Sequence, residues 1–82
     1  MCAQIDDENF LHVAIDEGDY QIFDLETHEK MGSNTEHEGS FHWLCVNHKN
    51  DKCAISDKEG SIILFNVSDR RNIIKEKELK PD

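Results

Sequence analysis

The sequence predicts an all-β fold made of two similar four-stranded antiparallel sheets, and three observations lead to this prediction. First, Leu11–Leu25 aligns without a gap with Cys53–Val67 at an offset of 42 residues, a period within the range of repeat architectures. Second, alternating apolar residues in both copies flank an acidic residue and a glycine, a pattern typical of a β-hairpin. Third, no segment has a clear helical period, and only Ile74–Lys80 is ambiguous.

The first copy begins with an incomplete first strand. Subtracting the offset of 42 from Trp43 reaches Met1, so the chain is expected to open partway through this strand. Asp6-Asp7-Glu8 then forms the polar turn into the next strand. The following strands are expected at about 10–15, 19–25 and Lys30–Thr35, the last as a polar outer edge. Glu17-Gly18 forms the tight turn of the hairpin, because glycine permits a positive φ.

The second copy contains a complete set of strands. These are expected at Phe41–Val46, 52–57, 61–67 and Arg71–Lys75. Glu59-Gly60 forms the turn between the two middle strands. Trp43 lies in the first strand of this copy, which is interpreted as running through the centre of the repeat unit, and is therefore expected in the core. Residues 77–82 form a charged tail.

The negative charge is concentrated in the first half of the chain. Residues 1–40 contain 11 acidic residues and one basic residue, whereas residues 41–82 contain 7 acidic and 8 basic residues. Such an acidic half repels phosphate backbones, which disfavours direct nucleic-acid binding. It would attract a basic partner. The simpler interpretation is a solvated surface that keeps the chain soluble.

Chain length and cysteine content limit the classes of protein to which this chain can belong. A chain of 82 residues forms one small domain at most, which disfavours an enzyme with a deep pocket. No run approaches the roughly 18 apolar residues of a membrane span, and no secretory leader opens the chain. Three cysteines cannot all pair, so a disulfide scaffold is not expected. We therefore expect a reducing compartment, the cytoplasm by default, with the nucleus as an open alternative.

Two segments resemble the WD40-repeat family. Glu36–Val46 resembles the Gly-His dipeptide, short loop and inner strand of such a repeat, with Glu36 where the glycine usually stands. Cys53–Val67 is similar to the middle hairpin, with Glu59-Gly60 at the Asp-Gly turn and Phe65-Asn66 at the Trp-Asp position. Phe23-Asp24 stands at the same position in the first copy. The period agrees with the family's 40 to 45 residues.

This resemblance implies two blades of a β-propeller, residues 1–35 and 36–76. It assigns structural roles to five residues, namely His37, Phe23, Phe65, Gly18 and Gly60. Phenylalanine replaces the characteristic tryptophan in both copies, so the indole N–H of the family's buried hydrogen-bond network is missing. His37 is then expected to bond to Glu59 or Ser56 of the hairpin.

The family mostly supplies rigid platforms for proteins or peptides, without chemistry of their own. Its geometry would place six acidic side chains on one loop face, namely Asp16, Glu17, Glu36, Glu38, Asp57 and Glu59, with Lys58 as the one base. The hypothesis is that this face docks a basic peptide or protein. The alternative is that these turn residues simply face water.

Two blades alone would leave apolar faces bare. Self-association, blades supplied by another chain, or membership in a longer protein would cover them. The run from Asn47–Lys49 through Ala54–Gly60, together with the acidic N-terminal region, is similar to repeats of the angio-associated migratory cell protein family. Its yeast relative escorts a basic ribosomal protein, which implies a ribosome-assembly escort as an alternative function.

The remaining alternative is a small metal-binding domain formed by cysteine and histidine. His42, Cys45, His48 and Cys53 are the one cluster with metal-like spacing. However, His42 and Cys45 have opposite parity on one strand and should point to opposite faces. Cys45 and Cys53 are instead expected to be small buried residues near one another across the hairpin. Neither has a glycine elbow, phosphate loop or oxyanion device beside it, so catalysis is not expected, and no cofactor is implied.

Overall fold

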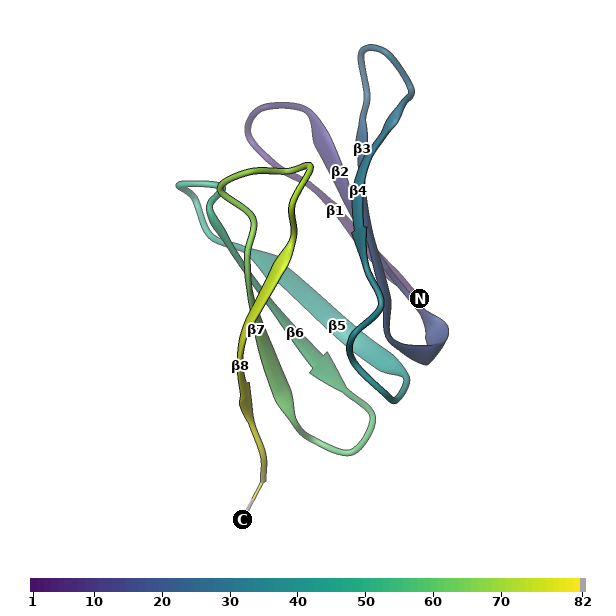
Figure 1. The fold of residues 1–82 in the computed structure, drawn as a ribbon, viewed down its shortest axis with the longest axis vertical. Coiled ribbons are helices and arrows are strands. Elements are labelled where there is room, and N and C mark those ends of the chain that lie inside the picture. The colour runs from purple at the N-terminus through teal and green to yellow at the C-terminus, as the bar shows by residue number, and fades with distance from the viewer. Residues whose placement is uncertain (82) are drawn as a thin grey trace.

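The structure, a computed structural model, describes residues 1–81 and is all-β. It contains two four-stranded antiparallel sheets, in the orders β1-β2-β3-β4 and β5-β6-β7-β8 (Figure 1). The strands of the first sheet are β1 (Cys2–Ile5), β2 (Phe10–Ile15), β3 (Asp19–Asp24) and β4 (Lys30–Asn34). Those of the second are β5 (Phe41–Val46), β6 (Lys52–Asp57), β7 (Ile62–Asn66) and β8 (Ile74–Leu79). Among the described residues, only the short 3-10 turn η1 (Asp16–Gly18) is helical.

The predicted pair of sheets is therefore confirmed, and the strand register matches the repeat. Leu11 pairs with Phe23 in the first sheet, and Cys53 pairs with Phe65 in the second. In β1 and β5, the first strands of the two sheets, equivalent residues are one position closer in sequence than elsewhere in the repeat. Cys2 pairs with Ala14 in the first sheet, and Trp43 pairs with Ser56 at the equivalent place in the second. The expected equivalence of Met1 and Trp43 was thus wrong by one position, since the turn after β1 is one residue shorter than the turn after β5.

The core is one apolar layer between the two sheets. Tyr20 and Ile22 of β3 are fully buried against Ile55 of β6 and Phe65 of β7. The rings of Tyr20 and Phe65 meet edge to face, with centroids 5.1 Å apart, a favourable arrangement for two aromatic rings. In Figure 1 the sheets lie closest at β5, which contacts β1 and β2, while β8 stands far from the first sheet.

Polar contacts also join the sheets. The backbone N–H of Val46 donates to Oε1 of Gln4 at 3.1 Å, and the Asn34 side chain donates to the carbonyl of Ile73 at 2.9 Å. Gly32 lies directly against the backbone of Arg70 and Arg71, where a Cβ atom would collide. The connection from β7 to β8 therefore packs against the first sheet rather than projecting into solvent.

This packing explains why the last strand was misplaced. The edge strand was expected at Arg71–Lys75 but spans Ile74–Leu79, and residues 77–79 belong to this strand instead of a tail. The segment before it turns back toward the first sheet, where Arg70 is held. The ambiguous stretch Ile74–Lys80 is consequently a strand over most of its length.

Each sheet has a second face that points away from the other sheet. Leu11, Val13 and Phe23 alternate with the buried residues of β2 and β3 and lie on the outer face of the first sheet. On the second sheet, Trp43 and Ile62 are 66% and 42% exposed. Trp43 was expected in the core of a central strand, but β5 is an edge strand of its sheet, and Trp43 points outward with Cys45 while Leu44 and Val46 point inward. The β-bulge between Phe41 and Trp43 returns the Phe41 side chain to the buried face.

Candidate functional site

A cavity of about 580 Å³ lies beside the turn between β6 and β7. The loop before β5, the end of β6, this turn and β8 supply its walls. Five carboxylates line it, those of Glu36, Glu38, Asp57, Glu59 and Glu78. The lining also contains two lysines, Lys75 and Lys80. The volume falls within the range of about 300 to 1,000 Å³ that is usual for ligand sites.

Asp57 organises the inner wall of the cavity. Its Oδ1 accepts hydrogen bonds from the backbone N–H groups of Glu59 at 3.0 Å and Ser61 at 2.9 Å. Its Oδ2 lies 3.1 Å from Nε2 of His37. Burial acts to raise the pKa of the Asp57 carboxyl, but the hydrogen bonds from Ser61, Glu59 and His37 outweigh it and hold this pKa below its usual value. Asp57 is therefore an ionised acceptor that fixes the turn and the histidine together.

His37 is buried, with one ring nitrogen satisfied and one not. The Nε2–H donates to Asp57, and the ring stacks on Phe41 with centroids 5.2 Å apart. Nδ1 has no hydrogen-bond partner, and the nearest carboxylate oxygen, on Glu78, is 3.8 Å away. Sequence reasoning expected Glu59 or Ser56 as the partner of His37. Asp57 has that role because it ends β6 on the inward face, where the buried side chains of that strand lie.

Four of the six acids predicted for the loop face line this cavity. Glu36, Glu38, Asp57 and Glu59 converge there, whereas Asp16 and Glu17 do not. Those two occupy η1, and Oδ1 of Asp16 lies 3.4 Å from the N-terminal amino group. Gly18, which ends η1, packs against the carbonyl of His37. This turn therefore supports the loop that carries the cavity's histidine without lining the cavity.

Glu78 and the two lysines were missed because β8 was expected earlier in the chain. Glu78 accepts a hydrogen bond from Nζ of Lys75 at 3.0 Å. This bond, more than the opposing effect of burial, lowers the pKa of the Glu78 carboxyl. Since the lysines neutralise only part of the acidic lining, the cavity attracts cations.

Two of the five residues with an expected structural role, both glycines, lie in tight turns. Gly18 and Gly60 have φ values of 84° and 92°, as tight turns need. Phe65 is fully buried between the sheets. Phe23 has the equivalent register position but lies on the outer face of the first sheet and is half-buried. The two phenylalanines therefore differ only in whether another sheet covers their face.

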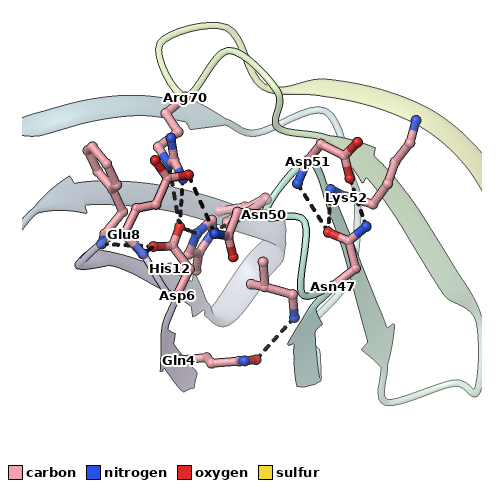
Figure 2. A network of polar contacts seen from close by, with 12 residues as sticks. Gln4, Asp6, Glu8, His12, Asn47, Asn50, Asp51, Lys52 and Arg70 are labelled. Atoms are coloured by element: carbon pink, nitrogen blue, oxygen red, sulfur yellow. Dashed lines mark hydrogen bonds and ion pairs between the residues drawn. The ribbon is translucent and has the colours of Figure 1, made fainter.

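A second polar cluster is enclosed between the sheets, and no motif had indicated it (Figure 2). Nε2 of His12 lies 2.8 Å from Oδ2 of Asp6, and Nδ1 lies 2.7 Å from the Tyr20 hydroxyl. Arg70 reaches the same Asp6 oxygen at 3.2 Å and Glu8 at 3.0 Å. Burial lowers the pKa of His12, and the positive charge of Arg70 adds to this, while the Asp6 carboxylate opposes it.

The side chains of Asp6 and His12 are fully buried. Their hydrogen bonds satisfy both ring nitrogens of a neutral His12, with Nε2–H donating to Asp6 and the Tyr20 hydroxyl donating to Nδ1. The cluster therefore serves to hold the first sheet and the β7–β8 connection together. Its members are distant in sequence and only the tertiary fold brings them together.

The cysteines do not form the arrangement that was expected. Cys53 is buried and Cys45 is exposed, on opposite faces of the paired strands β5 and β6. Burial raises the pKa of the Cys53 thiol to about 12. Within residues 1–81, no group of three or more His, Cys, Asp or Glu side chains is arranged to hold a metal ion. His42 lies in the β5 bulge and His48 in the β5–β6 turn, both exposed.

Comparison with known proteins identifies no relative. No family model matches the chain, and neither a curated protein nor a solved structure is detectably similar to it. Over its described part, the chain forms no helix of the length and apolar character that crossing a membrane requires.

Proposed function

We propose that this chain is a non-catalytic interaction scaffold of the WD40 type that docks a basic segment of another protein in its acidic cavity. The observation that carries the proposal is the convergence of Glu36, Glu38, Asp57 and Glu59 with Glu78 around one cavity of about 580 Å³. These residues come from three separate segments, so their proximity is a property of the fold. A basic segment would complement their charge and associate faster at low ionic strength.

The strand arrangement supports the propeller-blade part of this proposal. Each sheet is a meander of four sequential strands, and the inner strands β1 and β5 contact each other across the core. Propeller blades are likewise four-stranded antiparallel sheets, and they pack face to face around an axis. The His37–Asp57 hydrogen bond would take the place of the network that the family closes with tryptophan.

The outer faces support the proposal that further blades complete the assembly. Trp43, Ile62 and Leu79 are exposed together on one side of the second sheet. Contiguous apolar patches of this kind mark interaction sites. We propose that blades from another chain, or from a second copy of this one, cover both outer faces. Escort of a basic ribosomal protein would be a special case of the same docking.

A binding titration tests the proposal. A fluorescent peptide rich in lysine and arginine should bind the protein, and binding should weaken as salt rises. The double variant Glu38→Gln, Glu59→Gln should bind several-fold more weakly. Glu26→Gln with Glu29→Gln is the matched control, because these exposed acids lie in the β3–β4 turn outside the cavity. Binding that is insensitive to salt, or equal losses in both variants, would contradict the proposal.

A further inference from the structure

The unpartnered nitrogen of His37 indicates which chemical group enters the acidic cavity. His37 as a whole is 4% exposed, and it lines the cavity together with Glu78. Its Nδ1 faces Glu78 across 3.8 Å, which is beyond hydrogen-bond distance. Buried polar atoms in folded proteins nearly always have a partner. Because His37 and Glu78 both belong to the cavity lining, a ligand bound in the cavity is the natural source of a partner for this buried nitrogen.

The tautomer of His37 decides what this partner must be. Because the Asp57 carboxylate accepts from Nε2–H, a neutral ring has only a lone pair at Nδ1. The missing partner is thus a hydrogen-bond donor. The carboxylates around the cavity outnumber the lysines, which favours a donor with a positive charge and disfavours an anion. A metal ion is disfavoured because the residues that the structure describes contain no suitable ligand cluster.

We propose that a lysine side chain of the docked partner enters this cavity and donates one N–H to Nδ1 of His37 and another to Glu78. This inference rests on the proposed function, because it names the group that the basic segment inserts. An ammonium group has three diverging donors and is compact, which suits acceptors that belong to separate residues. The planar guanidinium fork of arginine instead suits both oxygens of one carboxylate.

The decisive experiment alters the peptide and leaves the protein unchanged. Three peptides are compared on the wild-type chain, with lysine, trimethyllysine or acetyl-lysine at a single position in an otherwise neutral sequence. Trimethyllysine keeps the charge but has no N–H donor, whereas acetyl-lysine keeps one N–H and loses the charge. Both modified peptides should bind about tenfold to a hundredfold more weakly than the lysine peptide, since a hydrogen bond from a charged donor is lost in each.

Two substitutions of His37 provide matched variants. His37→Gln places an amide near the former Nε2 and retains a donor for Asp57, but it has no acceptor at the position of Nδ1. His37→Asn places its amide oxygen near that position and loses the contact with Asp57. We expect the preference for lysine over trimethyllysine to disappear in His37→Gln and to persist in His37→Asn.

The outcomes separate this inference from the proposed function. Equal, salt-sensitive binding of the lysine and trimethyllysine peptides would overturn the inference and leave basic-segment docking intact. Failure of every basic peptide to bind would overturn both. A nitrogen NMR measurement needs no variant: the Nδ1 resonance of His37 should shift when the lysine peptide binds, and an unchanged resonance in a saturated complex would overturn the inference.

Discussion

Arg70 shows how much one side chain contributes to joining the two sheets. Its guanidinium contacts Asp6 at 3.2 Å and Glu8 at 3.0 Å, and it lies 4.0 Å above the ring of Phe10. Arg70 is mostly shielded from solvent and Asp6 is fully buried, so the ion pair is screened less than a surface pair. Without Arg70, the buried carboxylate would be left with His12 and backbone N–H groups as its partners.

We therefore predict that Arg70→Met lowers the free energy of unfolding by about 3 kcal/mol, because it leaves a buried charge without its counterion. Methionine retains much of the apolar stem above Phe10. Arg71→Met is the matched control, since Arg71 is exposed, and its effect should stay within about 0.5 kcal/mol. Urea denaturation followed by circular dichroism measures both values. Equal effects of the two substitutions would show that the Arg70–Asp6 contact contributes little.

The pKa directions in the same cluster predict how stability depends on pH. Burial lowers the pKa of His12 in the folded state, so the unfolded chain binds a proton first as the pH falls. The contribution of neutral His12 to the free energy of unfolding should therefore be fully present above about pH 6.5, the ordinary pKa of histidine. The free energy of unfolding should decrease as the pH falls below that value. Urea midpoints at pH 8 and pH 5.5 test this, and a higher midpoint at pH 5.5 would contradict it.

A further loss of stability is expected at lower pH. The pKa values of Asp6 and Asp57 are lowered in the folded state despite burial, since hydrogen bonds to the carboxylates outweigh it. Their contribution is present above about pH 4 and is lost as the pH falls through their folded-state values.

At the scale of elements, the two hairpin turns make different demands on their glycines. Gly18 has a φ of 84° and also packs against the carbonyl of His37, where a Cβ atom would collide. Gly60 has a φ of 92°, but the nearest atom to its added Cβ would be in Pro81 at 3.7 Å. The turn at Gly18 therefore fixes the loop that carries His37, whereas the turn at Gly60 needs only the backbone conformation.

We predict that Gly60→Ala costs about 1 to 2 kcal/mol of stability, the cost of a left-handed conformation for an alanine. Gly18→Ala should cost clearly more and should also weaken peptide binding, because the 37–39 loop must move. The difference between the urea midpoints of the two variants measures the extra loss of stability that the collision with the His37 carbonyl causes at Gly18. Equal costs, with binding unaffected, would show that this loop does not depend on the turn.

Elements that local sequence patterns define were predicted from the sequence, whereas elements that depend on contacts between distant residues were not. The hairpins were predicted because their period of two and their acidic-glycine turns are local patterns. The start of β8 was not predicted because it depends on the contact of Arg70 with Asp6, 64 residues away in the sequence. The exposure of Trp43 was also missed, because the continuous apolar run from Phe41 to Val46 does not show which alternate residues face the core.

Part of the cavity lining belongs to segments that the sequence had singled out. Glu36, Glu38, Asp57 and Glu59 line the cavity and belong to turns and loops that the WD40 resemblance implied to share one face, whereas Asp16 and Glu17 of the same expected set lie elsewhere. Glu78 was not found because it depends on the position of β8. The choice of Asp57 as the partner of His37 required the inward face of β6, which only the register between strands determines.

At the scale of the whole molecule, residues at equivalent positions of the repeat lie on the exposed outer face of one sheet and on the packed face of the other. Ile62 and Leu64 on the outer face of the second sheet hold the register positions of Tyr20 and Ile22 on the packed face of the first. Leu11 and Phe23 on the outer face of the first sheet similarly correspond to Cys53 and Phe65 on the packed face of the second. The outer face of one copy's second sheet is thus suited to the outer face of another copy's first sheet.

This complementarity predicts a head-to-tail association, which forms rings or filaments and not simple symmetric dimers. Sedimentation should show oligomers larger than dimers as the protein concentration rises. Ile5→Lys and Ile62→Lys place a charge on the outer faces of the first and second sheets, respectively, at residues that are 56% and 42% exposed, so folding should be little affected.

Each of these variants alone should be monomeric, because each lacks one of the two complementary faces. An equimolar mixture should form heterodimers and nothing larger, because one intact face of each kind remains and pairs with its complement. A symmetric interface would behave differently, since one of the two variants would still dimerise alone. Monomeric wild-type protein at all concentrations would instead indicate that another chain provides the neighbouring blades, or that the sheets are not propeller blades.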